Sequence, residues 1–231
     1  MNHLAITFIA AGAGYLLGSL NGAQILHHIF RPLFPRHITR IGTKIAGTQN
    51  VWMTIGKFPA LFVLAIDISK GYLAVYVSKA LGLEIPLALI GGVAAVLGHN
   101  WPLFFHFRGG RGVATLVGAL FALDFQVALF VALLGQFFTL IRWSGIMPFA
   151  LIVGFAYFRY QSWGTTLILL LIAVVAIIIV KRLQAYWPFL ARSKNKLWSF
   201  KNILWYDRPR ANPPSLKKVF NLEKLKIAKK D

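Results

Sequence analysis

The chain has 231 residues, of which 58% are hydrophobic and 13% are charged, about half the charged share of an ordinary soluble domain. Too few charges remain to cover the surface of a soluble protein of this length, so we expect an integral membrane protein. The chain has no cysteine, which excludes disulfide frameworks, thiolate zinc sites and cysteine nucleophiles. Its 25 Lys and Arg against 6 Asp and Glu give a net charge of +19.

Long apolar runs predict an all-α fold, a polytopic membrane helix bundle of about seven transmembrane helices with cytoplasmic active-site loops. A bilayer core needs about 20 apolar residues per helix, and fewer where a segment is short or re-entrant. The runs lie at residues 4–25, 58–80, 85–105, 113–123, 125–141, 146–160 and 165–180. The fourth and fifth are short enough to form one broken helix, which leaves six spans as an alternative. The first run lacks the basic n-region of a cleaved signal peptide.

The basic residues predict the orientation in the membrane. The segment from Lys181 to the end carries a net charge of +11. Cytoplasmic segments retain Lys and Arg, so we expect a cytoplasmic C-terminus and, with seven spans, cytoplasmic loops at 30–50, 106–112 and 142–145. We divide the chain into a transmembrane domain, 1–182, and a basic cytoplasmic tail, 183–231, loop-like after Trp198. The tail suits anionic membrane lipids, and no nucleic-acid partner is expected because the body offers no soluble nucleic-acid fold.

The most informative motif is residues 98–115, GHNWPLFFHFRGGRGVAT, directly before and into an apolar run. Gly109, Gly110 and Gly112 permit a tight turn in which several backbone amides point one way. Amides at a helix start, together with the guanidinium groups of Arg108 and Arg111, form a phosphate-sized anion site. The alternative is a cytoplasmic turn whose arginines only fix the topology.

Two weaker constellations could also bind an anion. Residues 42–50, GTKIAGTQN, combine glycines, hydroxyls and a lysine, although Asn50 as a simple helix cap is the favoured interpretation of this motif alone. Asp67 and Lys70 lie three residues apart inside an apolar run, so they share one helix face. They form either a structural ion pair or a site where Lys70 reaches a bound phosphate. Ser19 is by itself a small residue typical of helix packing.

Several other chemistries lack their residues. A His-x4-Asp acyltransferase motif is absent, because Phe104 follows His99 and Arg111 follows His106 at the position that needs Asp. The chain has no Gly-x-Ser-x-Gly nucleophile elbow. Three acids in the membrane body argue against carboxylate-bridged metal sites, and we expect neither metal nor cofactor. What remains is an enzyme or carrier that handles anions with backbone amides and cations.

The motifs resemble those of one family. Residues 97–115 are similar to the Gly-His-x-x-Pro…Gly-Gly-Lys-Gly-Val-Ala-Thr signature of the bacterial acyl-phosphate:glycerol-3-phosphate acyltransferases (the PlsY family), with Arg111 in place of the usual Lys. Residues 67–71 resemble its Asp-x-x-Lys-Gly, and Gly18-Ser19 its Gly-Ser in the first helix. The chain departs from the family pattern at four positions: Ile45, Gln49, Met53 and Ala185.

The resemblance implies transfer of a fatty acyl group from acyl-phosphate to glycerol 3-phosphate at the bacterial inner membrane. The products are lysophosphatidic acid and phosphate, in phospholipid biosynthesis. It implies catalytic roles for Thr43, Asn50, Lys70 and His99. It also implies a set of phosphate-binding residues: Ser19, Gly42, Gly47, Gly109, Gly110, Arg111, Gly112 and Thr115. Two alternatives stay open: a catalytically silent relative that binds acyl-phosphate or phospholipid, and a small anion transporter. Oligomeric state does not follow from the sequence.

Overall fold

The computed structural model describes residues 2–30, 37–140 and 145–206, and every regular element in these ranges is helical, which confirms the all-α prediction. Most of the expected third cytoplasmic loop, at 142–144, and the tail at 207–231 lie outside the described residues. The elements are α1 (His3–Ser19), α2 (Gly22–Ile29), η2 (Ile38–Arg40), α3 (Thr48–Thr54), α4 (Lys57–Ala80), α5 (Leu89–Asn100), η3 (Leu103–Phe105), α6 (Val113–Leu123), α7 (Phe125–Leu140), α8 (Met147–Arg192) and α9 (Lys196–Tyr206).

Each predicted apolar run corresponds to a helix, a helix pair or one half of α8. α8 changes direction at Gly164, whose φ of 58° and ψ of −152° lie outside the helical region and suit a residue without a Cβ. By length and composition α4 and α8 can each cross a membrane, and α1 with α2 adds a third candidate if this pair, bent by 43°, is one span. The count of about seven spans therefore stays a prediction.

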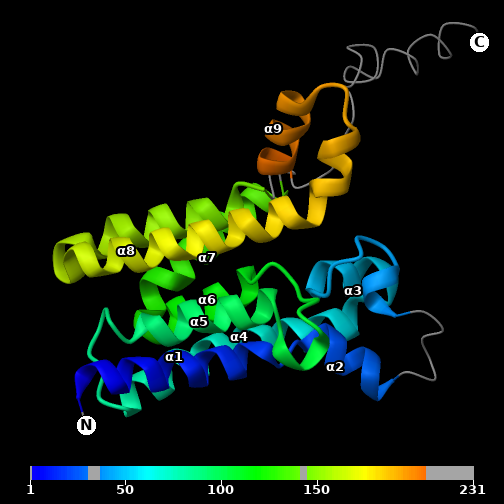
Figure 1. The fold of residues 1–231 in the computed structure, drawn as a ribbon. Coiled ribbons are helices and arrows are strands. Elements are labelled where there is room, and N and C mark those ends of the chain that lie inside the picture. Colours follow the sequence, from blue (N-terminus) through cyan, green and yellow to red (C-terminus); the bar gives the residue numbers. More distant parts are fainter. Residues whose placement is uncertain (1, 31–36, 141–144, 207–231) are drawn as a thin grey trace, which may run out of the picture.

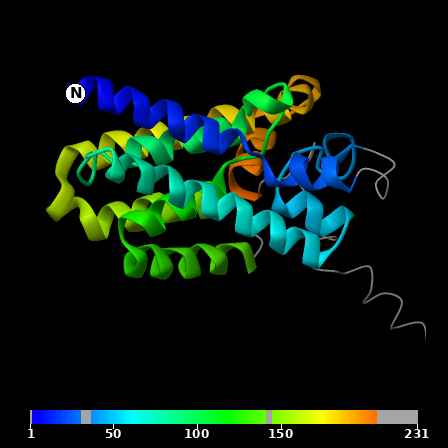
Figure 2. The same cartoon turned by 90° about the horizontal axis from the view of Figure 1, so that it is seen from below.

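The helices form two layers. α1, α4, α5 and α6 pack against one another, and α7 with the hairpin of α8 covers one side of them (Figure 1). The apolar core between the layers includes Leu116 and Leu120 of α6 and Leu151, Phe155 and Leu167 of α8. α2 and α3 gather at the end of the bundle opposite to the start of α1, as the view from below also shows (Figure 2).

Small residues allow the helices of the first layer to approach closely. A Cβ on Gly18 would lie 2.1 Å from the carbonyl oxygen of Ala95, and a Cβ on Gly71 only 1.9 Å from that of Thr115. Such backbone contacts are how helices pack in membranes, where burial of apolar area gives little driving force. Because Ser19 and Lys70 each adjoin one of these glycines, the packing also brings polar residues of different helices together.

The described chain stays helical past Trp198, where the sequence had predicted a loop-like segment. The prediction of a loop-like segment after Trp198 is wrong up to residue 206, because α9 continues to Tyr206. The boundary drawn after residue 182 lies inside α8. Buried Arg182 explains the order of this region, since its Nη1 donates hydrogen bonds to the carbonyl oxygens of Gly145 and Leu204, at 2.8 and 3.3 Å.

Candidate active site

The first glycine loop, residues 42–47, is held by Asn50. The Asn50 side chain is buried; its Nδ2 donates to the carbonyl oxygens of Ile38 and Ile41, at 2.9 and 3.2 Å, and its Oδ1 accepts from the backbone N–H of Thr43, at 2.9 Å. Gly42 has a φ of 56°, and a Cβ there would lie 2.2 Å from Asn50 Oδ1. The Asn50 amide therefore holds the chain from Ile38 to Thr43 in place, and its catalytic role stays a prediction.

The second glycine loop, residues 109–112, lies against the first. The backbone N–H of Gly110 donates to the carbonyl oxygen of His99, at 3.1 Å. A Cβ on Gly110 would lie 2.6 Å from the carbonyl oxygen of Ala46 and 2.1 Å from Nε2 of His99. Gly110 thus fills the narrow space between the first loop and the His99 imidazole, and the two loops form a single site.

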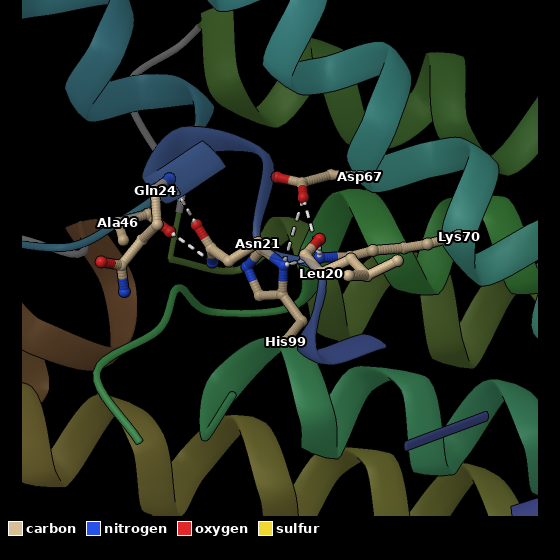
Figure 3. Close-up of polar contacts among 7 residues, drawn as sticks. All are labelled: Leu20, Asn21, Gln24, Ala46, Asp67, Lys70 and His99. Atoms are coloured by element: carbon tan, nitrogen blue, oxygen red, sulfur yellow. Dashed lines mark hydrogen bonds and ion pairs between the residues drawn. The ribbon is translucent and has the colours of Figure 1, made fainter. Parts of the chain in front are cut away.

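Two polar residues at the start of α2, its N-cap Asn21 and Gln24 of its first turn, tie both loops to the bundle. Asn21 caps α2 through the N–H of Gln24, at 3.1 Å, and donates from Nδ2 to the carbonyl oxygen of Ala46, at 3.2 Å (Figure 3). The Gln24 side chain donates from Nε2 to the carbonyl oxygen of Arg108. One helix junction therefore positions the first loop through Asn21 and the second through Gln24.

A buried ionic cluster of Asp67, Lys70 and His99 lies beside the loops (Figure 3). Lys70 Nζ lies 2.9 Å from Asp67 Oδ1, 2.8 Å from His99 Nδ1 and 3.1 Å from the carbonyl oxygen of Leu20. His99 Nδ1 is 3.4 Å from the same Asp67 oxygen. The predicted ion pair of Asp67 and Lys70 is present, and His99 of another helix extends it.

The three neighbours of Lys70 determine the protonation of His99. An ammonium group has three N–H donors and no acceptor. With Lys70 charged, its ammonium can only donate to His99 Nδ1, at 2.8 Å, which assigns Nδ1 as the acceptor and Nε2 as the nitrogen that carries the proton of a neutral ring. Since Nε2 faces Gly110, His99 presents an N–H donor toward the glycine loops.

Arg111 is held by a tyrosine from α8. Its Nη2 donates to the Tyr186 hydroxyl, and its guanidinium carbon lies 5.5 Å from the centre of the Tyr186 ring. Burial lowers the pKa of the Arg111 guanidinium below its usual value, and the contact with Tyr186 opposes this shift. A guanidinium stays protonated at neutral pH, so a positive charge remains fixed at the second loop.

The start of α6 adds further polar groups. Gly112 begins the helix with a φ of 74°, and no side chain caps the first backbone amides of α6. Within the described ranges, Oδ1 and Nδ2 of buried Asn100 and Oγ1 of buried Thr115 have no hydrogen-bond partner. A Cβ on Gly112 would lie 2.9 Å from Asn100 Oδ1. Free amides with positive helix-dipole character favour an anion here.

Two other predicted phosphate ligands differ in their surroundings. The hydroxyl of buried Ser19 donates to the carbonyl oxygen of Tyr15, at 2.8 Å, and accepts from the N–H of Leu103, at 3.2 Å, so it joins α1 to η3. Gly47 instead borders open space, with no atom within 4 Å of where its Cβ would be. Room for a ligand thus exists at Gly47, whereas the Ser19 hydroxyl already makes two structural hydrogen bonds.

The end of α8 supplies residues that contact Trp101 and Arg111. Trp101 Nε1 donates to Gln184 Oε1, at 2.8 Å, and Lys181 Nζ lies 5.1 Å from the centre of the Trp101 ring. Of the residues at the end of α8, Tyr186 contacts the second loop through Arg111, and Gln184 and Lys181 contact Trp101. The family resemblance had indicated residues 181–185, as the counterpart of a family motif that keeps only its positive charge here, but it did not indicate Tyr186. Asn21 and Gln24 had a weak signal as polar residues within the first run.

Fold and site together define a helical membrane protein with a cationic, donor-rich site at one end of its bundle. The family model described as glycerol-3-phosphate acyltransferase matches residues 8–190. Glycerol-3-phosphate acyltransferase 2 of Dehalococcoides mccartyi is 32% identical over 206 residues, 86% of this chain and 92% of that protein. The enzyme named glycerol-3-phosphate acyltransferase from Tolumonas auensis is 41% identical over 130 residues, 55% of this chain and 62% of that protein.

Solved structures agree with these matches. The crystal structure of PlsY (YgiH), an integral membrane glycerol 3-phosphate acyltransferase, in its glycerol 3-phosphate form aligns with a TM-score of 0.67 and 26% identity, covering 80% of this chain and 92% of that one. Its lysophosphatidic acid form aligns with a TM-score of 0.66. The chain belongs to the glycerol-3-phosphate acyltransferase family, of the PlsY type, and is an integral membrane protein.

Proposed function

We propose that this protein transfers a fatty acyl group from acyl-phosphate to the 1-hydroxyl of glycerol 3-phosphate, giving lysophosphatidic acid and inorganic phosphate. The observation that carries the proposal is the contact of both glycine loops at Gly110, beside Nε2 of His99. Two phosphate-bearing substrates repel each other, and a site that joins loop amides, an imidazole N–H and the Arg111 guanidinium offsets that repulsion. The names of the relatives support the same acceptor.

The reaction needs no protein nucleophile, because phosphate is already a good leaving group. The 1-hydroxyl oxygen attacks the carbonyl carbon, the bond from that carbon to the phosphate oxygen breaks, and the departing phosphate takes the hydroxyl proton. Holding the two substrates in line can lower the barrier by roughly 7–11 kcal/mol. Donors aimed at the carbonyl oxygen and the leaving phosphate stabilise the charge that develops there.

We assign the residues by the groups they present. Gly109, Gly110, Arg111 and Gly112 bind one phosphate through backbone amides and the guanidinium, and His99 donates from Nε2. Lys70 positions His99 by bonding to its Nδ1. Gly42, Thr43 and Gly47 border the carbonyl group that reacts, and Asn50 shapes their loop. Thr115 and Ser19 complete the polar lining of the site.

We also propose the placement in the cell that the charges favour. The chain resides in the bacterial inner membrane with the loops and the C-terminus in the cytoplasm, where Lys and Arg are retained. Residues 1–182 act as the membrane domain, and the basic segment 183–231 binds anionic lipid headgroups.

The decisive experiment uses the full-length protein in phosphatidylcholine nanodiscs with palmitoyl-phosphate and radiolabelled glycerol 3-phosphate. We expect labelled lysophosphatidic acid and an equal amount of released phosphate. Arg111→Ala should lower kcat/KM at least tenfold, while Arg192→Ala, an exposed arginine at the end of α8, should match the unchanged protein. Substrate binding without product would overturn the proposal in favour of a silent relative, and glycerol 3-phosphate uptake into vesicles in favour of a transporter.

A further inference from the structure

A polar cavity of about 580 Å³ lies at the same end of the bundle as the glycine loops. It is bounded by α2, η2, η3 and the segment that follows η3. We call it the histidine pocket, and its lining residues are Gln24, His27, His28, His37, Thr39, Arg40, Phe104, Phe105, His106 and Arg108. Four of the six histidines of the chain therefore line one cavity.

Two of these imidazoles are fixed by contacts. The rings of His27 and His37 pack edge to face, with their centres 4.5 Å apart, and His27 is buried. Nδ1 of His37 accepts from the backbone N–H of Thr39, at 3.3 Å, and lies 2.8 Å from the Thr39 hydroxyl. With Nδ1 accepting, Nε2 of His37 carries the proton. The contacts therefore fix the His27 and His37 rings in place, with an N–H donor at Nε2 of His37.

The charge of the pocket suits an anion. Arg40 and Arg108 provide two permanent positive charges, and the imidazole rings add N–H donors beside them. None of the acids in the described ranges, Asp67, Glu84 and Asp124, lines the cavity. Nor does any group of three His, Cys, Asp or Glu within those ranges have the arrangement needed to hold a metal ion. A phosphate group, which accepts several charge-assisted hydrogen bonds, matches this lining.

Apolar side chains around the pocket indicate where that phosphate comes from. Phe104, a lining residue, is 54% exposed, and Ile29, Leu103 and Phe107 beside the lining segments are 61%, 48% and 53% exposed. A soluble phosphate has no apolar surface to bury against these side chains, whereas the acyl chains of a lipid bury apolar surface against them. Cationic groups beside exposed apolar side chains are typical of lipid headgroup sites at the membrane surface.

The pocket is separate from the acyl-transfer site, but Gln24 contacts both the pocket and the chain next to the second glycine loop. Gln24 lines the pocket and binds the carbonyl oxygen of Arg108, the residue directly before the second glycine loop. His99 and Arg111 of the acyl-transfer site are not among its lining residues. An occupant would therefore touch the chain next to the loop without entering the place of the substrates.

We propose that the histidine pocket binds the phosphate headgroup of an anionic membrane lipid, at a site distinct from the acyl-transfer site. The headgroup lies between Arg40, Arg108 and the imidazoles, and its chains lie along the exposed Phe104 and its apolar neighbours.

The test uses the full-length protein with ¹⁵N-labelled histidine in nanodiscs of phosphatidylcholine, with and without phosphatidic acid. Phosphatidic acid should shift the imidazole signals of His27, His28, His37 and His106. The signals of His3, at the far end of α1, and of His99 should stay in place. A shift of His99 alone, or no shift, would overturn the proposal, and this readout does not depend on catalytic turnover.

Variants distinguish lipid binding in this pocket from lipid binding by the basic tail, and inorganic phosphate serves as the soluble anion for comparison. The double variant His28→Gln/Arg40→Gln should weaken phosphatidic acid binding about tenfold, the loss expected for one charge-assisted hydrogen bond. His3→Gln should leave it unchanged. Inorganic phosphate should shift the four signals only weakly at millimolar concentration; an effect equal to that of the lipid would overturn the lipid assignment. So would equal lipid binding by the double variant and the unchanged protein.

Discussion

Lys70 shows how a single residue can organise this site. A buried ammonium is costly unless it is paired, and here Lys70 forms an ion pair with the Asp67 carboxylate and hydrogen bonds with the Leu20 carbonyl oxygen and His99 Nδ1. The bond to Nδ1 holds the His99 ring with Nε2 toward Gly110. The sequence left two interpretations of Asp67 and Lys70: a structural ion pair, or a functional site. One cluster can serve as both, because the ion pair also positions His99.

Replacement of Lys70 tests this cluster. Lys70→Met leaves the Asp67 carboxylate buried without its main partner, so we expect a loss of about 3 kcal/mol in the free energy of unfolding. Asp67→Asn/Lys70→Met removes both charges and should recover most of that loss. Denaturant unfolding of the two variants in detergent measures the difference. If the double variant is no more stable than Lys70→Met, the loss does not come from leaving the Asp67 carboxylate unpaired.

Tyr186 is the partner through which α8 reaches Arg111. Tyr186→Phe keeps the ring beside the guanidinium but removes the hydroxyl that accepts its hydrogen bond. We expect KM for glycerol 3-phosphate to rise about fivefold, equivalent to about 1 kcal/mol, with little change in kcat. Tyr160→Phe, an exposed tyrosine of α8, is the matched control. An unchanged KM in Tyr186→Phe would show that Arg111 needs no support from α8.

At the scale of elements, the site depends on two loops that each precede a helix and meet at Gly110. Gly110→Ala places a methyl group against His99 Nε2 and the Ala46 carbonyl oxygen, which forces the loops apart. We expect at least a hundredfold loss of kcat/KM with the helical content retained by circular dichroism. Gly12→Ala in α1, where a Cβ meets nothing within 4 Å, should keep full activity. Full activity in Gly110→Ala would refute the shared site.

The sequence predicted elements better than contacts between them. Apolar runs located the helices because a bilayer-spanning helix must be apolar along its whole length. The bonds of Asn21 and Gln24 to Ala46 and Arg108, and that of Tyr186 to Arg111, join residues 25 to 84 positions apart, so no local pattern encodes them. Asn50 shows the same limit, since a capping pattern gave no sign of its three bonds to the preceding loop.

At the scale of the whole molecule, the polar residues are divided between the two ends of the bundle. The glycine loops, α2 and α3 lie at one end, and the connection from α4 to α5 lies at the other (Figures 1 and 2). The histidine pocket, lined by residues of α2, η2 and η3, belongs to the first of these ends. A soluble, phosphorylated acceptor reaches a membrane enzyme only from the compartment that contains it. The end with both loops therefore faces the cytoplasm if the proposed function holds.

The absence of cysteine allows this orientation to be tested directly. Gln49→Cys, exposed at the first loop, and Glu84→Cys, exposed between α4 and α5, each introduce one thiol at opposite ends of the bundle. In intact spheroplasts a membrane-impermeant maleimide should label Glu84→Cys, whereas Gln49→Cys should be labelled only after permeabilisation. The cysteine-free chain is the blank. The reverse pattern would place the loops outside the cell, away from cytoplasmic glycerol 3-phosphate, and would refute both the orientation and the proposed reaction there.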